Sequence, residues 1–452
     1  MVTEMEFLKN NLLTQRRHDL LIMPTFIFKN MNSKLIIYFS YVLLITSCSS
    51  CKDEMLNDNE FWKTPLNQKS LIYDSGLGYP IFKNTVVFHS TPVPFGFEQS
   101  ILHGLDTKTG KEKWRLTNTD FYPKKTLQFN NADYYYQNEN IVVGADFQYK
   151  DSGSETYMYA IDIEKGKVLW VKEFANKGLQ FGRMVIGSGK YAYVDFQKDT
   201  TEFSLIKIDI KTGDFSETFK FTQTNIPQTM PEKSVSFSQM SQVYADNSGN
   251  KFVAISFNGN NYDKDKFKVY MTLCVYNLTE NKIVYTKYVN NQTLGKDEWD
   301  DFYGRVTYFN GKLLVGKSKK IYCFDAFEDK SALWQQNTGS YGNDNAMQVF
   351  GCDNLALGFT VDRLFAYDIN SGNELYNVPA AGSNTANVID GVIYQRDGSD
   401  LQMRDPKTGK ELKRIATGRN EQAFSSSRPN GADGRIYVHT YTDAYCIKAW
   451  GK

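Results

Sequence analysis

The densest group of carboxylates in the chain surrounds a tryptophan. In the segment GKDEWDDFYGR, Asp297, Glu298, Asp300 and Asp301 flank Trp299. Carboxylate oxygens suit Ca²⁺ and an aromatic face suits a pyranose ring, so this segment could hold a cation or a sugar. The alternative is a solvated acidic turn with Trp299 packed into an interior seam. The EF-hand order of ligands and glycine is missing, which favours the acidic turn.

Cysteine and histidine give little sign of metal chemistry. The chain has six Cys and four His, and no spacing between them matches a zinc site. Cys323 and Cys446 occupy the same position in the repeat described below, where alanine stands in other copies, which predicts buried core positions. Cys274 and Cys352 lie in further predicted strands. A structural disulfide is the alternative, but thiols on separate sheets should exceed the ~5.5–6 Å Cα spacing that a disulfide needs.

The N-terminal stretch is typical of a lipoprotein signal. Lys34 precedes the apolar run LIIYFSYVLLIT, which is shorter than the ~20 residues that span a bilayer. A charged start, a short apolar core and then small residues indicate a secretory signal peptide. The segment Ile45-Thr46-Ser47-Cys48 resembles the lipobox of bacterial lipoproteins, which implies cleavage after Ser47 and lipidation of Cys48. An ordinary signal peptide with an incidental cysteine is the alternative.

This anchor divides the chain. Met31 stands just before the charged start, so we interpret residues 1–30 as an upstream extension, 31–47 as the signal peptide, 48–68 as lipid anchor and tether, and 69–452 as the folded domain. Lys52-Asp53-Glu54 resembles the surface-export signal of Bacteroidota lipoproteins. That resemblance implies an outer-membrane lipoprotein, with the cell surface favoured over the periplasmic face. A hydrophilic tether is the alternative, and Trp62 within it is expected to contribute little to stability.

A repeat organises the rest of the chain. Each copy has an apolar strand that ends in Asp or Asn, a polar turn, and a second strand that ends in an aromatic residue. The strand ends are Asp106, Asp162, Asp209, Asn277, Asp325, Asp368 and Asp405. The turn glycines are Gly110, Gly166, Gly372 and Gly409, and the aromatic residues are Trp114, Trp170, Tyr285, Trp334 and Tyr376. Glu217 and Lys413 stand at the aromatic position in the two remaining copies.

The repeat predicts a β-propeller. Copies recur every 37 to 68 residues, around the ~40–50 residues typical of propeller blades. Glycine allows the turn, Asp caps it, and an aromatic on an outer strand can wedge against the next sheet. We therefore predict an all-β propeller of four-stranded antiparallel blades, eight in number, closed by N- and C-terminal strands with residues 70–75 completing the last blade. Seven blades is the alternative if the copy from Leu273 to Tyr285 is not separate.

These motifs resemble the PQQ-like, quinoprotein-type repeat family, and the resemblance covers most of residues 70–450. Quinoprotein dehydrogenases of that family bind PQQ beneath a vicinal disulfide and hold Ca²⁺ nearby. No two Cys residues are adjacent here, and no Asp matches the catalytic position. We therefore expect no cofactor, with PQQ disfavoured and Ca²⁺ only weakly indicated. Anchor and repeats together also resemble the outer-membrane-protein assembly lipoproteins, although no partner-contacting residue is carried over.

The sequence thus favours a non-catalytic envelope lipoprotein that binds a protein or glycan through its propeller loops. Lys+Arg 52 against Asp+Glu 51 gives no reason to expect nucleic acid. The candidate binding residues are Tyr262, in the longest gap between repeats, and Asp297, Trp299 and Asp301. We expect a monomeric propeller that meets the membrane only through its lipid. The alternatives are a PQQ-dependent oxidoreductase and a surface glycan-capture protein.

Overall fold

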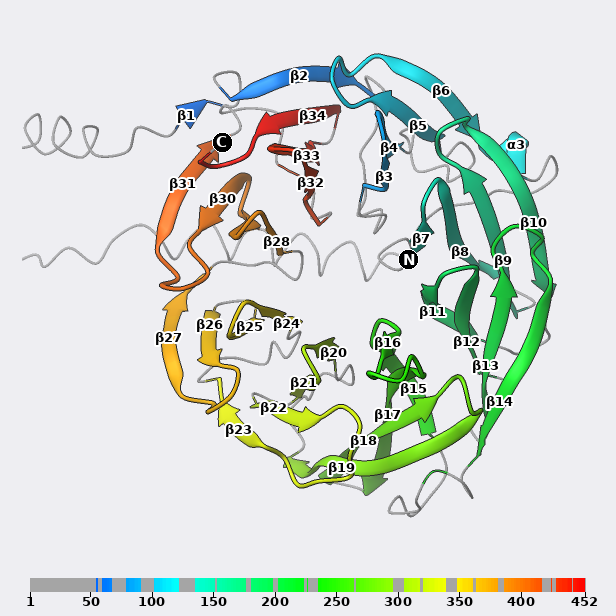
Figure 1. Cartoon of the computed structure of the whole chain (residues 1–452), viewed down its shortest axis with the longest axis vertical. Coiled ribbons are helices and arrows are strands. Elements are labelled where there is room, and N and C mark those ends of the chain that lie inside the picture. The colour runs from blue at the N-terminus through cyan, green and yellow to red at the C-terminus, as the bar shows by residue number, and fades with distance from the viewer. Residues whose placement is uncertain are drawn as a thin grey trace, which may run out of the picture. The chain divides into compact units, whose positions relative to one another are not determined.

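The described part of the chain begins at Glu54. The computed structural model describes residues 54–55, 59–66, 79–90, 101–121, 135–150, 153–175, 180–197, 202–222, 226, 235–263, 266–295, 305–317, 320–338, 348–360, 363–380, 386–416, 424, 428–440 and 442–451. Eight antiparallel sheets follow one another around a ring (Figure 1). The prediction of an eight-bladed propeller is therefore confirmed, and the copy from Leu273 to Tyr285 belongs to a blade of its own.

The first four blades run in chain order. Blade 1 contains β3 (Ile81–Phe82), β4 (Thr85–Ser90), β5 (Ile101–Asp106) and β6 (Glu112–Thr117), followed by the short helix α3 (Asn118–Phe121). Blade 2 contains β7 (Tyr136–Asn138), β8 (Ile141–Lys150), β9 (Gly153–Asp162) and β10 (Lys167–Ala175). Blade 3 contains β11 (Gln180–Ser188), β12 (Tyr191–Gln197), β13 (Glu202–Asp209) and β14 (Phe215–Thr222). Blade 4 contains β15 (Val235–Met240), β16 (Tyr244–Ala245), β17 (Lys251–Asp263), β18 (Lys266–Asn277) and β19 (Lys282–Gly295).

The second four blades complete the ring. Blade 5 contains β20 (Arg305–Phe309), β21 (Lys312–Lys317), β22 (Lys320–Asp325) and β23 (Trp334–Asn337). Blade 6 contains β24 (Gln348–Cys352), β25 (Leu355–Phe359), β26 (Arg363–Asp368) and β27 (Glu374–Pro379). Blade 7 contains β28 (Asn387–Ile389), β29 (Val392–Asp397), β30 (Asp400–Arg404), β31 (Glu411–Ala416) and, parallel to β31, β1 (Glu54–Met55). Blade 8 contains β32 (Asn430–Ala432), β33 (Arg435–His439), β34 (Asp443–Lys448) and β2 (Glu60–Pro65).

Blade 8 closes the ring by joining the two ends of the described chain. Its outer strand is β2, which pairs antiparallel with β34. The prediction that residues 69–452 form the propeller, with residues 70–75 as the closing strand, is therefore corrected: strands from residue 54 onward belong to the ring, and residues 70–75 lie outside the described part of the chain. The C-terminal part of the chain contributes three strands to blade 8, and β2 contributes the fourth.

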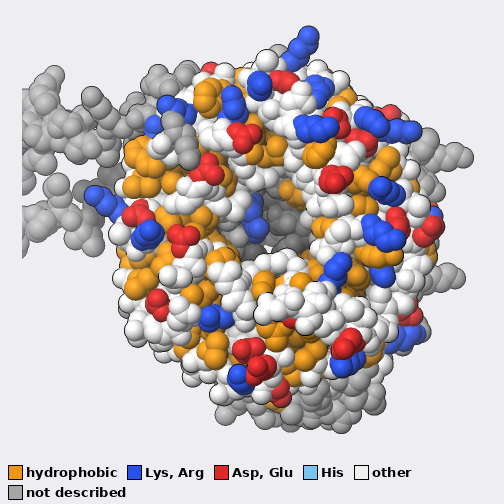
Figure 2. Space-filling view, viewed as in Figure 1, with side chains coloured by type: hydrophobic (Ala, Val, Ile, Leu, Met, Phe, Trp, Pro, Cys, Tyr) orange, Lys and Arg blue, Asp and Glu red, His pale blue; other side chains and the backbone are white. Residues whose placement is uncertain are grey.

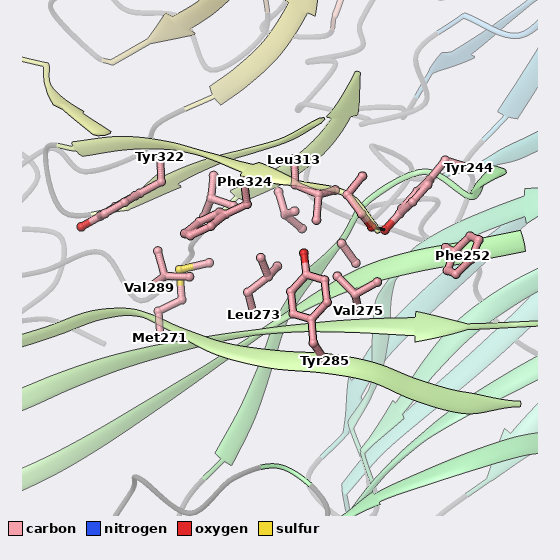
Figure 3. Packing of buried hydrophobic residues seen from close by; sticks show 14 residues of the cluster. Tyr244, Phe252, Met271, Leu273, Val275, Tyr285, Val289, Leu313, Tyr322 and Phe324 are labelled. Atoms are coloured by element: carbon pink, nitrogen blue, oxygen red, sulfur yellow. Dashed lines mark hydrogen bonds between the residues drawn. The ribbon is translucent and has the colours of Figure 1, made fainter. Parts of the chain in front are cut away.

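The buried apolar side chains do not form a single central core; they lie between neighbouring blades. Among the described residues, the buried apolar side chains form eight clusters, and each cluster combines side chains from two neighbouring blades. In the cluster between blades 4 and 5, Tyr285 of β19 points toward Leu313 and Phe324 of blade 5 (Figure 3). Since each blade is covered on both faces, strands such as β21 and β25 read as continuous apolar runs. No helix in the described part of the chain is long and apolar enough to cross a membrane.

Candidate functional site

The repeat residues form two linked structures: a capped turn in each copy and, at most junctions, a hydrogen bond that docks one blade onto the next. The first is the turn itself: Asp106 Oδ1 accepts the main-chain N–H groups of Lys108 and Thr109 at 3.0 and 2.9 Å. The same position in the other copies, Asp162, Asp209, Asn277, Asp325, Asp368 and Asp405, accepts one or two N–H groups of its own turn. Hydrogen bonds from the backbone N–H and hydroxyl of Ser371 lower the pKa of Asp368. These carboxylates therefore hold turns and are not free for chemistry.

The second structure docks one blade onto the next. The Trp114 Nε1–H donates to the carbonyl of Ile163, one residue after Asp162, at 2.9 Å. The equivalent bonds join Trp170 to Ile210, Trp334 to Ile369, Tyr285 to Asp325 and Tyr376 to Pro406, at 2.7–3.0 Å. Gly166 has φ +62°, and a Cβ there would lie 2.2 Å from Trp114 Cγ. The turn glycine thus provides both the left-handed backbone and the space for the indole.

Trp62 is the docking residue that our sequence reasoning missed. Its side chain is buried, and its Nε1–H donates to the carbonyl of Thr107 at 3.0 Å, the same bond that the other docking tryptophans make. The expectation that Trp62 contributes little to stability is therefore wrong. The signal was present, because Glu60-Phe61-Trp62 repeats the pattern of Glu112-Lys113-Trp114 without the preceding Asp and Gly.

Two seams use other chemistry at the docking position. Between blades 3 and 4, where Glu217 replaces the aromatic, Phe219 and Phe221 pack on Tyr276 with ring centroids 5.0 and 5.4 Å apart. Between blades 7 and 8, Lys413 donates from Nζ to Asn59 Oδ1 at 2.6 Å. The departures in the sequence repeat thus coincide with seams that are joined by an aromatic cluster or by a lysine.

The centre of the ring holds a cavity of about 540 Å³, which appears as an opening in Figure 2. Its described lining comes mostly from the inner strands of blades 2 to 7. Aliphatic and small residues make up about half of this lining, and the remainder are aromatic rings, side-chain amides and one guanidinium, from Tyr135, Tyr136, Tyr308, Phe309, Phe350, Gln239, Gln242, Gln348, Asn387 and Arg428. Among the residues described there, none is Asp, Glu, Lys, His or Cys. The described part of this wall has the aromatic and amide groups that can bind a neutral polar ligand.

Two polar groups contribute to the hydrogen-bonding character of this cavity. Desolvation raises the pKa of Tyr135 to about 12. Gln348 donates from Nε2 to the carbonyl of Ala386 at 3.1 Å, and its buried Oε1 has no hydrogen-bond partner among the described residues. This wall was not predictable from the sequence, because it is formed by short runs of residues from six separate inner strands.

A line of three polar side chains in blade 1 has the spacing of a catalytic triad. Ser90 Oγ lies 2.7 Å from His103 Nε2, and His103 Nδ1 lies 2.7 Å from Glu112 Oε1. The hydrogen bond with His103 lowers the pKa of Glu112 to about 2. Ser90 is 0% exposed, however, so no substrate can reach its hydroxyl.

Blade 7 repeats this line without a nucleophile. Gln395 Nε2 donates to Gln402 Oε1 at 2.6 Å, and Gln402 in turn bonds to Glu411, with each residue on the next strand outward. The line in blade 1 therefore has the same arrangement as a polar ladder that joins adjacent strands.

Among the described hairpins that join the two middle strands of a blade, two are longer than the others. In blade 4, β17 and β18 form twelve residue pairs, from Phe252–Asn277 to Asp263–Lys266, whereas β4 and β5 of blade 1 form six. The six additional pairs correspond to about 20 Å of strand. The hairpin of β8 and β9 in blade 2, with ten pairs, is also long. We call these two hairpins the raised rim.

The predicted binding residues have different outcomes. Tyr262 pairs with Phe267 one step from the tip of the blade 4 hairpin, the longer of the two in the raised rim. Asp297, Trp299 and Asp301 lie outside the described residues. Within the described part, no group of three or more His, Cys, Asp or Glu side chains is arranged to hold a metal ion. Cys274, Cys323, Cys352 and Cys446 are free thiols, and Cys323 and Cys446 are buried as the repeat predicted, whereas Cys352 is partly exposed.

The fold and its docking bonds define a quinoprotein-type β-propeller. Residues 54–293, more than half of the chain, match the family described as "Outer membrane protein assembly factor BamB", and the chain belongs to that family. No curated protein matches. Among solved structures, BamB from Moraxella catarrhalis is 13% identical with a TM-score of 0.51, and Sqt1 from Saccharomyces cerevisiae is 8% identical with a TM-score of 0.50. Each comparison covers 86% of this chain and 99% of the other, and at such identities it shows the fold alone.

Proposed function

We propose that this chain is a non-catalytic scaffold, lipidated at Cys48, whose raised rim binds an integral outer-membrane protein. The observation that carries the proposal is the asymmetry of the ring: the β17–β18 hairpin of blade 4 has six residue pairs more than β4–β5 of blade 1, which is about 20 Å of additional strand. Hairpins that exceed the needs of the fold are where propellers present partner-specific surface. The family description points to outer-membrane proteins as the class of partner.

The polar wall of the ring supports the non-catalytic part of the proposal. The repeat carboxylates accept hydrogen bonds from their own turns, and the central cavity has no described acid or nucleophile on its wall. The anchoring part rests on the lipobox-like segment at Ile45–Cys48, and Lys52-Asp53-Glu54 favours the cell surface. Protease shaving of intact cells, with a periplasmic control protein, tests the location: loss of the propeller supports the surface, and survival until lysis contradicts it.

Site-specific photo-crosslinking in cells tests the partner. A photoreactive phenylalanine analogue placed at Tyr262 should form a covalent adduct with an integral outer-membrane protein. The matched control is the same analogue at Leu375, which is 49% exposed on the outer strand of blade 6, away from the raised rim. Adducts at Tyr262 alone support the proposal. The absence of an outer-membrane adduct at Tyr262, or equal adducts at both positions, contradicts it.

A glycan-binding function is the second candidate, and the central cavity favours it. Aromatic faces beside amide groups are the chemistry that holds sugar rings and their hydroxyls. Calorimetric titration of the lipidated chain with a panel of neutral glycans should then give saturable heats. Flat titrations across the panel would remove this candidate without touching the scaffold proposal.

A further inference from the structure

The site where the ring closes carries exposed aromatic and cationic side chains together. Phe61 is 50% exposed and Trp450 is 39% exposed, and both lie in blade 8 beside the closing strand. Arg435 lies over the Phe61 ring with Cζ 5.0 Å from the centroid, and Lys413 Nζ lies 5.7 Å from the Trp450 centroid. With the exposed Lys448, these five residues are named the closure patch.

The residues of the closure patch are connected through the strands that close the ring. Lys413, which faces Trp450, also bonds to Asn59, and the carbonyl of Asn59 accepts the main-chain N–H of Lys448 at 3.0 Å. Lys448 pairs with Arg435 across β33 and β34, and Arg435 in turn contacts Phe61. The five residues therefore belong to one hydrogen-bonded region where blades 7 and 8 meet.

Its positive charge is only partly offset. Among the described residues, neither Arg435 nor Lys448 takes part in an ion pair, and the buried Nε of Arg435 has no hydrogen-bond partner there. The carboxylates nearest in sequence are Glu60 and Asp433. An exposed tryptophan with lysine and arginine around it is the combination found where proteins meet the headgroup region of a bilayer.

Chain length brings this patch close to the membrane. Cys48 stands six residues before Glu54, the first residue of β1, and six extended residues reach at most about 20 Å. β1 pairs with β31 and β2 with β34, on the outer circumference where blades 7 and 8 meet (Figure 1). A lipid on Cys48 therefore keeps the bilayer surface within a short distance of the closure patch.

We propose that the closure patch rests on the phospholipid surface in which the chain's own lipid is inserted, with Trp450 and Phe61 in the headgroup region. This inference rests on the lipidation of Cys48 within the proposed function. Aromatic and basic residues that contact the headgroups add to the attachment that a lipid on Cys48 provides. The contact also fixes which side of the ring faces the bilayer, leaving blades 2 and 4 elsewhere on the circumference (Figure 1).

Fluorescence of the lipidated chain in vesicles tests the proposal. The vesicles contain phosphatidylethanolamine and phosphatidylglycerol, with or without bromine on the acyl chains near the headgroup. The Trp450 signal is obtained as the difference between the native chain and Trp450→Phe. Brominated lipid should quench that signal several-fold more than it quenches the other tryptophans. A tryptophan introduced by Phe61→Trp in the Trp450→Phe background should be quenched likewise.

The control reporter lies far from the patch on the same ring. Phe215 is 54% exposed at the start of β14 in blade 3, and Phe215→Trp in the Trp450→Phe background should not be quenched. Mass spectrometry of the same sample reports the lipid on Cys48. A lipidated chain whose Trp450 and Phe215→Trp signals respond equally overturns the closure-patch proposal and leaves the anchor standing. An unlipidated chain overturns the anchor and this proposal together.

Discussion

The main-chain N–H of Lys448 donates to the carbonyl of Asn59 at 3.0 Å. Elsewhere this bond closes a turn within one stretch of chain, as from Asp106 to Lys111 at 2.9 Å. In blade 8 the same turn is assembled from the first and last described parts of the chain, with no peptide link between them. The ring therefore depends on β2 remaining paired with β34, and on Trp62 remaining docked on blade 1.

Replacement of Trp62 should destabilise the protein as much as replacement of Trp170. Both indoles are buried and both donate to the carbonyl after a strand end, so Trp62→Ala and Trp170→Ala should each cost about 3–5 kcal/mol of unfolding free energy. Equilibrium urea unfolding measures the loss, with the exposed Leu375→Ala as control at under about 0.5 kcal/mol. A cost below about 1 kcal/mol for Trp62→Ala would show that the closing strand is not required.

Substitution of the turn glycine should separate backbone strain from loss of space. Gly166 and Gly189 both have positive φ, at +62° and +58°, but only Gly166 faces an indole, whereas a Cβ at Gly189 meets nothing within 4 Å. Gly189→Ala should therefore cost only the left-handed backbone penalty of about 1–2 kcal/mol. Gly166→Ala should lower the unfolding free energy by at least about 2 kcal/mol more than Gly189→Ala does, because the Trp114 indole must move away from the new methyl group. Equal losses in thermal or urea unfolding would contradict the docking geometry.

Stability should fall in mild acid because of two buried histidines. Burial lowers the pKa of His89 to about 3 and that of His439 to about 4, from an ordinary value of 6.5. Their contribution is fully present above pH 6.5 and is lost as pH falls toward those values, since the unfolded chain takes up protons first. Two such groups give a slope of about 2.7 kcal/mol per pH unit below pH 6.

Urea unfolding between pH 6.5 and 5 measures that slope, in a window above the titration of ordinary carboxylates. His439→Gln should halve it, because only His89 then remains to be protonated on unfolding. A slope that is unchanged in His439→Gln would mean that this imidazole is not held neutral by the fold.

Addition of PQQ with Ca²⁺ should leave the absorption and emission spectra of the chain unchanged. The described cavity wall has no carboxylate to hold Ca²⁺, and the chain has no adjacent cysteines to stack on the quinone. Difference spectroscopy with an alcohol- or sugar-dependent dye assay provides the measurement. A saturable quinone spectrum with dye reduction would overturn the non-catalytic proposal.

The fold was predictable because its signals are local. Asp106, Gly110 and Trp114 stand within nine residues of one another, so the turn and its docking residue can be recognised in one stretch and then found again. The closing strand was harder to predict, since blade 8 splits the motif between Trp62 and Lys448. Without the adjacent Asp and Gly, the isolated tryptophan resembles part of a tether.

The candidate sites were less predictable because they combine distant parts of the chain. Arg428 and Tyr135 line the same cavity from different blades, and no spacing along the chain predicts that they do so. The raised rim was partly predictable, because the gap from Asp209 to Asn277 exceeds what one blade needs, and Tyr262 lies within it. The closure patch was not predictable, since Phe61 meets Arg435 and Lys413 meets Trp450 only when the ring closes.

The turn shared by Asn59 and Lys448 also sets the order of folding. β2 is among the first strands to be synthesised, and its partner β34 is among the last, so this pairing has nearly the largest sequence separation that the chain allows. Blades 1 to 6 can form from local hairpins as the chain emerges, but Trp62 must wait for the whole chain before it can dock. A chain that loses its last strand after delivery should therefore release β2 and its buried indole, and become a substrate for proteases.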